Sequence, residues 1–173
     1  AYGADTLDTE YIKATFGYQL GDYPDSMHCY YSGAVIVNHA GKRFVNEEIS
    51  YKLLSDAALA QPDKFTLQLF DETIRLRRMK ENPRNAMILK KRDDHRDKPF
   101  CFVGATLEEV ARKAGVDAAE LVKTIEKYNA DVAGGRDTVF GRSSLSSGFD
   151  KPMPIKDPPF YLYPSEPRCI ATY

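Results

Sequence analysis

The sequence has 173 residues, of which 43% are hydrophobic and 28% charged, enough apolar material for one globular domain or a large piece of a bigger enzyme. Lysine and arginine total 24 against 25 acidic residues, so the formal net charge of -1 gives no overall electrostatic reason to bind nucleic acid or an anionic membrane. No stretch reaches the roughly 18 apolar residues of a membrane span, and the polar start at Ala1–Glu10 excludes an intact signal peptide.

The three cysteines, Cys29, Cys101 and Cys169, are too few and too far apart for a disulfide framework. They favour a reducing compartment such as the cytoplasm; a periplasmic location would need a signal in a part of the protein before Ala1. The histidines stand at no metal-ligand spacing with each other or with cysteine, so no metal site is predicted.

The N-terminal part is rich in tyrosine and glycine and shows no sustained periodicity. We expect a loop-rich segment with one short helix over Thr9–Thr15. Its tyrosines are weak candidates for lining an apolar pocket: Tyr18, Tyr23, Tyr30 and Tyr31.

A β-branched run over Gly33–Asn38, turn residues, and extended character over Lys42–Val45 predict a hairpin. Ser50 is the expected N-cap of a helix to about Ala60, with Leu53, Leu54, Ala57 and Ala58 on its buried stripe.

Phe65–Phe70 alternates apolar and polar residues, which predicts a strand, and Asp71 should cap a helix through Met79 that Pro83 closes. The stretch Arg75–Lys98 holds ten basic residues. No aromatic residue is interleaved there for base stacking, so a solvated loop is preferred to a nucleic-acid site.

Phe100–Val103 is predicted as a strand, followed by two helices that begin with capping boxes at Thr106 and Asp117. The tail Phe140–Tyr173 holds six prolines, so we expect it to be ordered, if at all, by packing against something else. Short strands and helices without a βαβ rhythm predict an α+β domain with a small sheet.

The chain has no Gly-x-Gly-x-x-Gly unit, no phosphate-binding loop of the Gly-x-x-x-x-Gly-Lys type and no Gly-x-Ser-x-Gly turn. It therefore lacks the usual backbone cradle for dinucleotide phosphates, and the residues alone indicate only an α+β domain that depends on a partner.

One block, Gly33-Ala-Val-Ile-Val-Asn-His-Ala-Gly-Lys-Arg-Phe-Val-Asn-Glu47, resembles the capping (substrate) domain of FAD-dependent fumarate reductase, succinate dehydrogenase and 3-ketosteroid dehydrogenase flavoproteins. The segments Leu121–Arg142, Pro158–Tyr161 and Ala171–Tyr173 are similar to later parts of that domain. The resemblance implies a junction segment at 1–31, a capping domain at 32–157, and a return toward the FAD domain at 158–173.

Departures from the fumarate reductase pattern bear on the substrate. Tyr51 stands where those enzymes carry an arginine, and Ala171-Thr172 stands where they carry a dicarboxylate-binding His-Thr. A C4 dicarboxylate would lose cationic partners, so the resemblance argues against such a substrate.

The run Asn46-Glu-Glu-Ile-Ser-Tyr51 is instead similar to the Asn-Glu-x-x-Pro-Tyr of ketosteroid dehydrogenases, with Ser50 in place of proline. This implies that Tyr51 is a catalytic proton-transfer residue beside the flavin, because a phenol can accept or donate the proton that accompanies hydride transfer. The alternative is an amphipathic aromatic at a helix start.

The same branch implies substrate-binding roles for Tyr161 and Tyr163, although tail tyrosines serve as packing anchors just as often. Thr172, which matches the threonine of the fumarate reductase His-Thr pair, is a further substrate-binding candidate. Arg43 and Glu47 should pin the hairpin by hydrogen bonds, and Arg142 should stabilise a loop rather than clamp a ligand. No cofactor-binding residue is assigned.

The resemblance implies an FAD-dependent oxidoreductase that reduces or dehydrogenates a carbon–carbon bond conjugated to a carbonyl. FAD would be held mainly by a domain outside this chain, which is the expected partner, so the isolated chain should bind no FAD and be inactive. The alternative is a non-catalytic binding module for a protein or an anionic partner.

Overall fold

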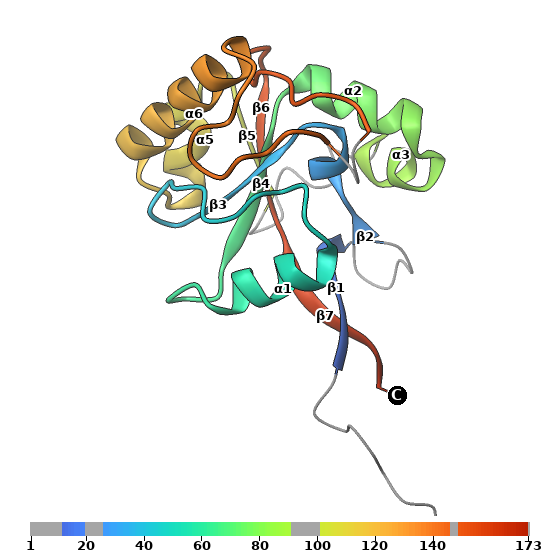
Figure 1. Cartoon of the computed structure of the whole chain (residues 1–173). Helices are drawn as coiled ribbons and strands as arrows, with labels where there is room; N and C mark the ends of the chain where they lie inside the picture. The colour runs from blue at the N-terminus through green and yellow to red at the C-terminus, as the bar shows by residue number, and fades with distance from the viewer. Residues whose placement is uncertain (1–11, 20–25, 91–100, 146–148, 173) are drawn as a thin grey trace, which may run out of the picture.

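The computed structural model describes residues 12–19, 26–90, 101–145 and 149–172. Within these ranges no helix is both long and apolar enough to cross a membrane. The fold consists of two antiparallel sheets with helices packed around them, which confirms the α+β class (Figure 1).

The larger sheet has four strands in the order β3-β4-β6-β5: β3 is Val35–Asn38, β4 is Thr66–Phe70, β6 is Phe160–Pro164 and β5 is Phe102–Gly104. Leu69 pairs with Val35 on one side and Leu162 on the other. Every residue of β4 and β6 is buried, as expected for inner strands covered on both faces.

The smaller sheet joins distant parts of the chain. Its central strand β1 (Ile12–Gln19) pairs with β7 (Glu166–Thr172) on one side and with the short β2 (Ser26–Met27) on the other. The pairing of Ile12 with Thr172 brings the two ends of the described chain together, below the main body in Figure 1.

The helices lie in three places around the sheets (Figure 1). α1 (Tyr51–Leu59) packs on β1 and β7. α2 (Glu72–Glu81) and α3 (Pro83–Lys90) pack together, with α2 against the 3-10 helix η1 (Cys29–Ser32). α5 (Leu107–Ala114) packs on α6 (Ala118–Ala133) and covers β5 and β6.

Local capping signals are confirmed. The side chains of Ser50, Asp71, Thr106 and Asp117 each accept a hydrogen bond from the backbone amide three residues on. α5 ends at Gly115 in the left-handed conformation that its position after the helix predicts.

The turn after β3 is held tightly against α6. Gly41 has a φ of 71°, and a Cβ atom there would lie 2.7 Å from the Asp117 carbonyl oxygen and 2.7 Å from the Leu121 amide nitrogen. Only glycine fits this position without displacing backbone.

Some predictions of elements are wrong. The expected helix over Thr9–Thr15 is strand β1 from Ile12 onward, because pairing with β7 decides its conformation; residues 9–11 lie outside the described residues. The second half of the hairpin is a single bridge between Val37 and Arg43. Leu53, expected on the buried stripe of α1, is 54% exposed.

Two longer segments also differ from expectation. As far as Lys90 the basic stretch lies in two helices, α2 and α3, with Arg75 and Arg78 buried rather than solvated; its remainder lies outside the described residues. The tail is ordered by this chain itself, because β6 pairs with both β4 and β5.

Candidate functional site

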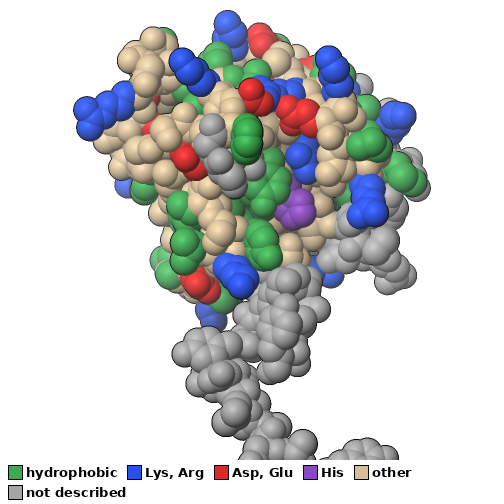
Figure 2. All heavy atoms as spheres, turned by 45° about the vertical axis from the view of Figure 1, so that its right-hand side comes forward, with side chains coloured by type: hydrophobic (Ala, Val, Ile, Leu, Met, Phe, Trp, Pro, Cys, Tyr) green, Lys and Arg blue, Asp and Glu red, His purple; other side chains and the backbone are tan. Residues whose placement is uncertain are grey.

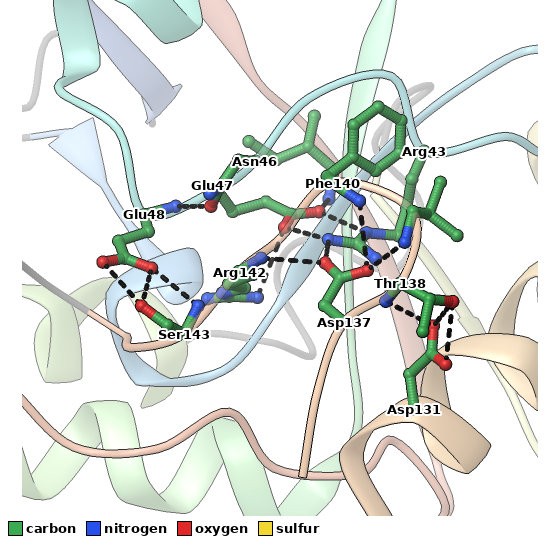
Figure 3. A network of polar contacts seen from close by, with 12 residues as sticks. Arg43, Asn46, Glu47, Glu48, Asp131, Asp137, Thr138, Phe140, Arg142 and Ser143 are labelled. Atoms are coloured by element: carbon green, nitrogen blue, oxygen red, sulfur yellow. Dashed lines mark hydrogen bonds and ion pairs between the residues drawn. The ribbon is translucent and has the colours of Figure 1, made fainter. Parts of the chain in front are cut away.

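The loop between β3 and α1 is held by a buried charge network (Figure 3). Arg43 donates from Nε and Nη2 to the two carboxylate oxygens of Glu47, at 2.8 and 2.7 Å. Its Nη2 also donates to Asp137 Oδ2 at 2.8 Å, and none of the three side chains is more than 4% exposed. The predicted structural role of Arg43 and Glu47 is confirmed.

Both kinds of charge in this network are stabilised by their partners. Burial works against the charged form of Arg43, but Glu47 and Asp137 outweigh it and raise the pKa of the guanidinium. Burial likewise opposes ionisation of Asp137, yet the hydrogen bond and charge of Arg43 hold its pKa at about 2. Arg43 and Asp137 therefore stay ionised at neutral pH.

Arg142 fastens a second loop to the same place. Its fully buried guanidinium donates to the carbonyl oxygens of Tyr30 at 2.7 Å and Ala34 at 3.0 Å, and lies 3.6 Å from Glu47. Glu48 accepts hydrogen bonds from the backbone amides of Ser143 and Ser144. These contacts confirm that Arg142 stabilises a loop.

Tyr51 comes directly after this pinned loop and is the first residue of α1. Its ring is half-buried against the core. One turn later the Ser55 hydroxyl donates to the Tyr51 carbonyl at 2.9 Å and lies 3.4 Å from the Thr15 carbonyl of β1. The backbone at the start of α1 is thus held by the pinned loop on one side and by its contact with β1 on the other.

The other predicted site residues lie elsewhere. Tyr161 is fully buried, donates its hydroxyl proton to Glu72 at 2.6 Å and stacks on Phe70. Tyr163 is 1% exposed, and burial raises its pKa. Both rings are enclosed in the larger sheet, which supports the packing alternative; a substrate contact stays a prediction.

Thr172 lies at the end of β7, in the same sheet on which α1 packs. The structure thus places Tyr51 and Thr172 at the smaller sheet, and Tyr161 and Tyr163 in the larger sheet. Of the early tyrosines, Tyr18 and Tyr30 are in the core, Tyr31 is half-buried, and Tyr23 lies outside the described residues.

Sequence reasoning missed Asp137, which closes the network from 94 residues away. Its only signal was its place in the Gly-Arg-Asp run after a long helix. Among the residues that the structure places, no group of three histidine, cysteine or acidic side chains could hold a metal ion.

Comparison with known proteins identifies a family and several relatives of this chain. A family model described as an FAD binding domain matches residues 20–168. A "Probable fumarate reductase" of Shewanella frigidimarina (strain NCIMB 400) is 33% identical over 140 residues, which cover 81% of this chain and 21% of that protein. The chain therefore spans about a fifth of the length of this curated relative.

Two solved structures share the fold. The solution structure of a fumarate reductase flavoprotein subunit from Lactobacillus plantarum superposes with a TM-score of 0.62 at 25% identity, covering 90% of this chain and 99% of that one. The 3-ketosteroid delta1-dehydrogenase of Sterolibacterium denitrificans gives a TM-score of 0.75 at 22% identity, covering 94% and 32%. The second likeness concerns the fold alone.

Proposed function

The chain belongs to the FAD binding domain family, and from this we propose that it is the substrate-capping domain of a larger flavoprotein oxidoreductase. The whole enzyme would reduce or dehydrogenate a carbon–carbon bond conjugated to a carbonyl, by hydride exchange with FAD. The name of the curated relative, a probable fumarate reductase, supports this reaction class.

The helix N-termini of the described residues support a proposal in which this chain is not the main holder of FAD. The N-termini of α1, α2, α5 and α6 are each occupied by the capping side chain of their own helix, and two of these caps are the carboxylates of Asp71 and Asp117. Carboxylate caps disfavour a phosphate at the same amides. We therefore propose that the cofactor is held mainly by a part of the protein outside this chain, which is also the partner of the capping domain.

The topology supports a domain inserted into a longer chain. Because β1 and β7 are antiparallel neighbours, the polypeptide enters and leaves the fold at one place. The solution structure from Lactobacillus plantarum, which this chain covers to 99%, supports an independent unit of this extent.

Within this assignment, Tyr51 is the proposed catalytic residue, and the observation that carries it is its half-buried position on a doubly anchored helix start. Bound FAD supplies hydride exchange at one carbon of the substrate. Tyr51 would donate or accept the proton at the neighbouring carbon through its hydroxyl. Tyr51 stands where fumarate reductases carry an arginine, and Ala171 stands where they carry a histidine. The loss of both cationic side chains supports a substrate other than a C4 dicarboxylate.

Tyr51→Phe in the full-length enzyme tests this role. Phenylalanine keeps the packing of the ring and removes only the hydroxyl, so flavin content should be unchanged while turnover of an enone substrate falls by about 10² to 10⁴. Substrate binding should change less, because proton transfer occurs only in the transition state.

Tyr128→Phe is the matched control. The Tyr128 hydroxyl is buried and has no hydrogen-bond partner in the described part of the chain, so its removal should leave turnover near the wild-type value. A Tyr51→Phe enzyme with turnover within threefold of wild type would show that Tyr51 is not catalytic.

A further inference from the structure

Arg78, on α2, differs from the other buried arginines of the described chain. Arg43 pairs with Glu47 and Asp137, Arg142 has three carbonyl acceptors and lies near Glu47, and Arg75 makes a bidentate pair with Glu72 at 2.6 and 2.7 Å. Each of these guanidinium groups therefore has a carboxylate close by.

The guanidinium of Arg78 makes no ion pair with a carboxylate of the described residues, although the charge of Glu81 acts on it from a distance. The residue is only 7% exposed, and its Nε donates to Asn85 Oδ1 at 2.7 Å. Its terminal nitrogens have neither a hydrogen-bond acceptor nor an ion-pair partner among the residues the structure describes. The nearest acid on its helix, Glu81, uses its two oxygens for Arg77 and Ser32.

An unpaired buried charge is costly, which is why buried charges in proteins are almost always paired. Desolvation lowers the pKa of Arg78, in contrast to the raised pKa of Arg43 and Arg75. A guanidinium nevertheless keeps its proton at neutral pH, so it cannot escape the cost by becoming neutral. The terminal nitrogens are not among the fully buried polar atoms that lack a partner, so they are accessible to an anion that the described chain does not supply.

The surroundings hold Arg78 in a fixed orientation. Asn85 is 2% exposed; its Oδ1 also accepts from the His28 amide, and its Nδ2 donates to the Ser26 carbonyl, each at 3.1 Å. The Tyr31 ring lies 5.7 Å from the Arg78 guanidinium carbon. Asn85 thus positions the Nε side and leaves both terminal nitrogens as donors.

The chemistry of this place favours a monoanion with an apolar body. The rings of Tyr30 and Tyr31 are 4.5 Å apart, and the His28 ring lies 5.5 Å from that of Tyr31. Figure 2 shows hydrophobic side chains and a histidine together at the centre of one face, with charged groups around them. A planar fork with two free donors matches the two oxygens of a carboxylate, and the other buried arginine of α2, Arg75, is already paired with Glu72.

We propose that Arg78 binds a carboxylate that comes from outside the described chain. The carboxylate belongs either to a small-molecule acid or to an acidic side chain elsewhere in the full-length protein. In the first case the inference rests on the proposed function and specifies a substrate with a single carboxylate. Asn85 is then a positioning residue for Arg78.

Titration of the full-length protein with benzoate, and with benzamide as its neutral analogue, tests the first source by isothermal calorimetry. Benzoate should bind to wild type and to Arg112→Met, which removes an exposed arginine of α5. Arg78→Met should lower the affinity for benzoate at least tenfold, to the affinity that wild type has for benzamide. Arg78→Lys, which keeps the charge but not the fork, should give an intermediate loss and serves if the methionine variant does not fold.

Thermal unfolding of the same proteins tests the second source. If the carboxylate belongs to the protein, benzoate will bind to none of them, but Arg78→Met will lower the melting temperature by several degrees more than Arg112→Met, because an acid loses its cation.

The proposal is wrong if Arg78→Met leaves benzoate binding unchanged, or if benzoate does not bind and Arg78→Met is as stable as Arg112→Met or more so. A full-length protein without flavin, or with normal turnover after Tyr51→Phe, would contradict the proposed function but would not alter the reading of these titrations.

Discussion

Glu47→Gln should be among the most damaging conservative substitutions in this fold. Glu47 is fully buried, accepts hydrogen bonds from Arg43 and from the Ile36 amide, and lies 3.6 Å from Arg142. Glutamine keeps one acceptor oxygen but turns an NH2 group toward a guanidinium and leaves two buried cations with only Asp137. Breaking a buried ion pair costs about 3–5 kcal/mol, and the retained oxygen places this case near 3 kcal/mol.

Urea denaturation of the chain measures this loss. With a slope of about 2 kcal/mol per M, a loss of about 3 kcal/mol lowers the midpoint by about 1.5 M. Glu120→Gln is the matched control, because Glu120 lies 3.8 Å from Lys42 in a pair that is largely accessible to solvent. This control should lose about 0.5 kcal/mol or less.

The two substitutions must differ clearly for the reasoning to hold. Equal midpoints for Glu47→Gln and Glu120→Gln, at an unchanged slope, would show that the buried network contributes no more than a surface pair. A loss confined to Glu47→Gln with a changed slope would instead point to an altered denatured or native state.

Two further predictions concern the same region. The pKa of Asp137 is lowered to about 2, so its carboxylate contributes stability that is complete above its ordinary pKa near 4 and lost as pH falls through about 2. Asp137→Asn should therefore be less stable than wild type at pH 7. In acid titrations followed by circular dichroism, the stability of this variant should decline less steeply between pH 4 and 2. Gly41→Ala should lose about 1–3 kcal/mol in thermal or urea unfolding, because the left-handed backbone and the contact with α6 both oppose a Cβ atom; wild-type stability would mean that the turn relaxes freely.

The sequence by itself determined the elements whose causes are local. Ser50, Asp71, Thr106 and Asp117 cap their helices because a cap needs only a side-chain oxygen and an amide three residues away. Strand β4 was readable for the same reason, from its alternation and its flanking turn residues. The block around Arg43–Glu47 also indicated a pinned loop, since both partners lie within four residues.

Tertiary structure alone decided the features whose partners are distant in the chain. The segment that begins β1 is a strand because β7 pairs with it across more than 150 residues, and the proline-rich tail supplies the inner strand β6 because β4 and β5 accept it. Asp137 joins Arg43, and Asn85 holds Arg78 against His28 and Ser26, by contacts that no local pattern encodes. The burial of Arg78 followed from how α2 packs on η1, because charge and spacing along a helix do not show which face the rest of the fold will cover.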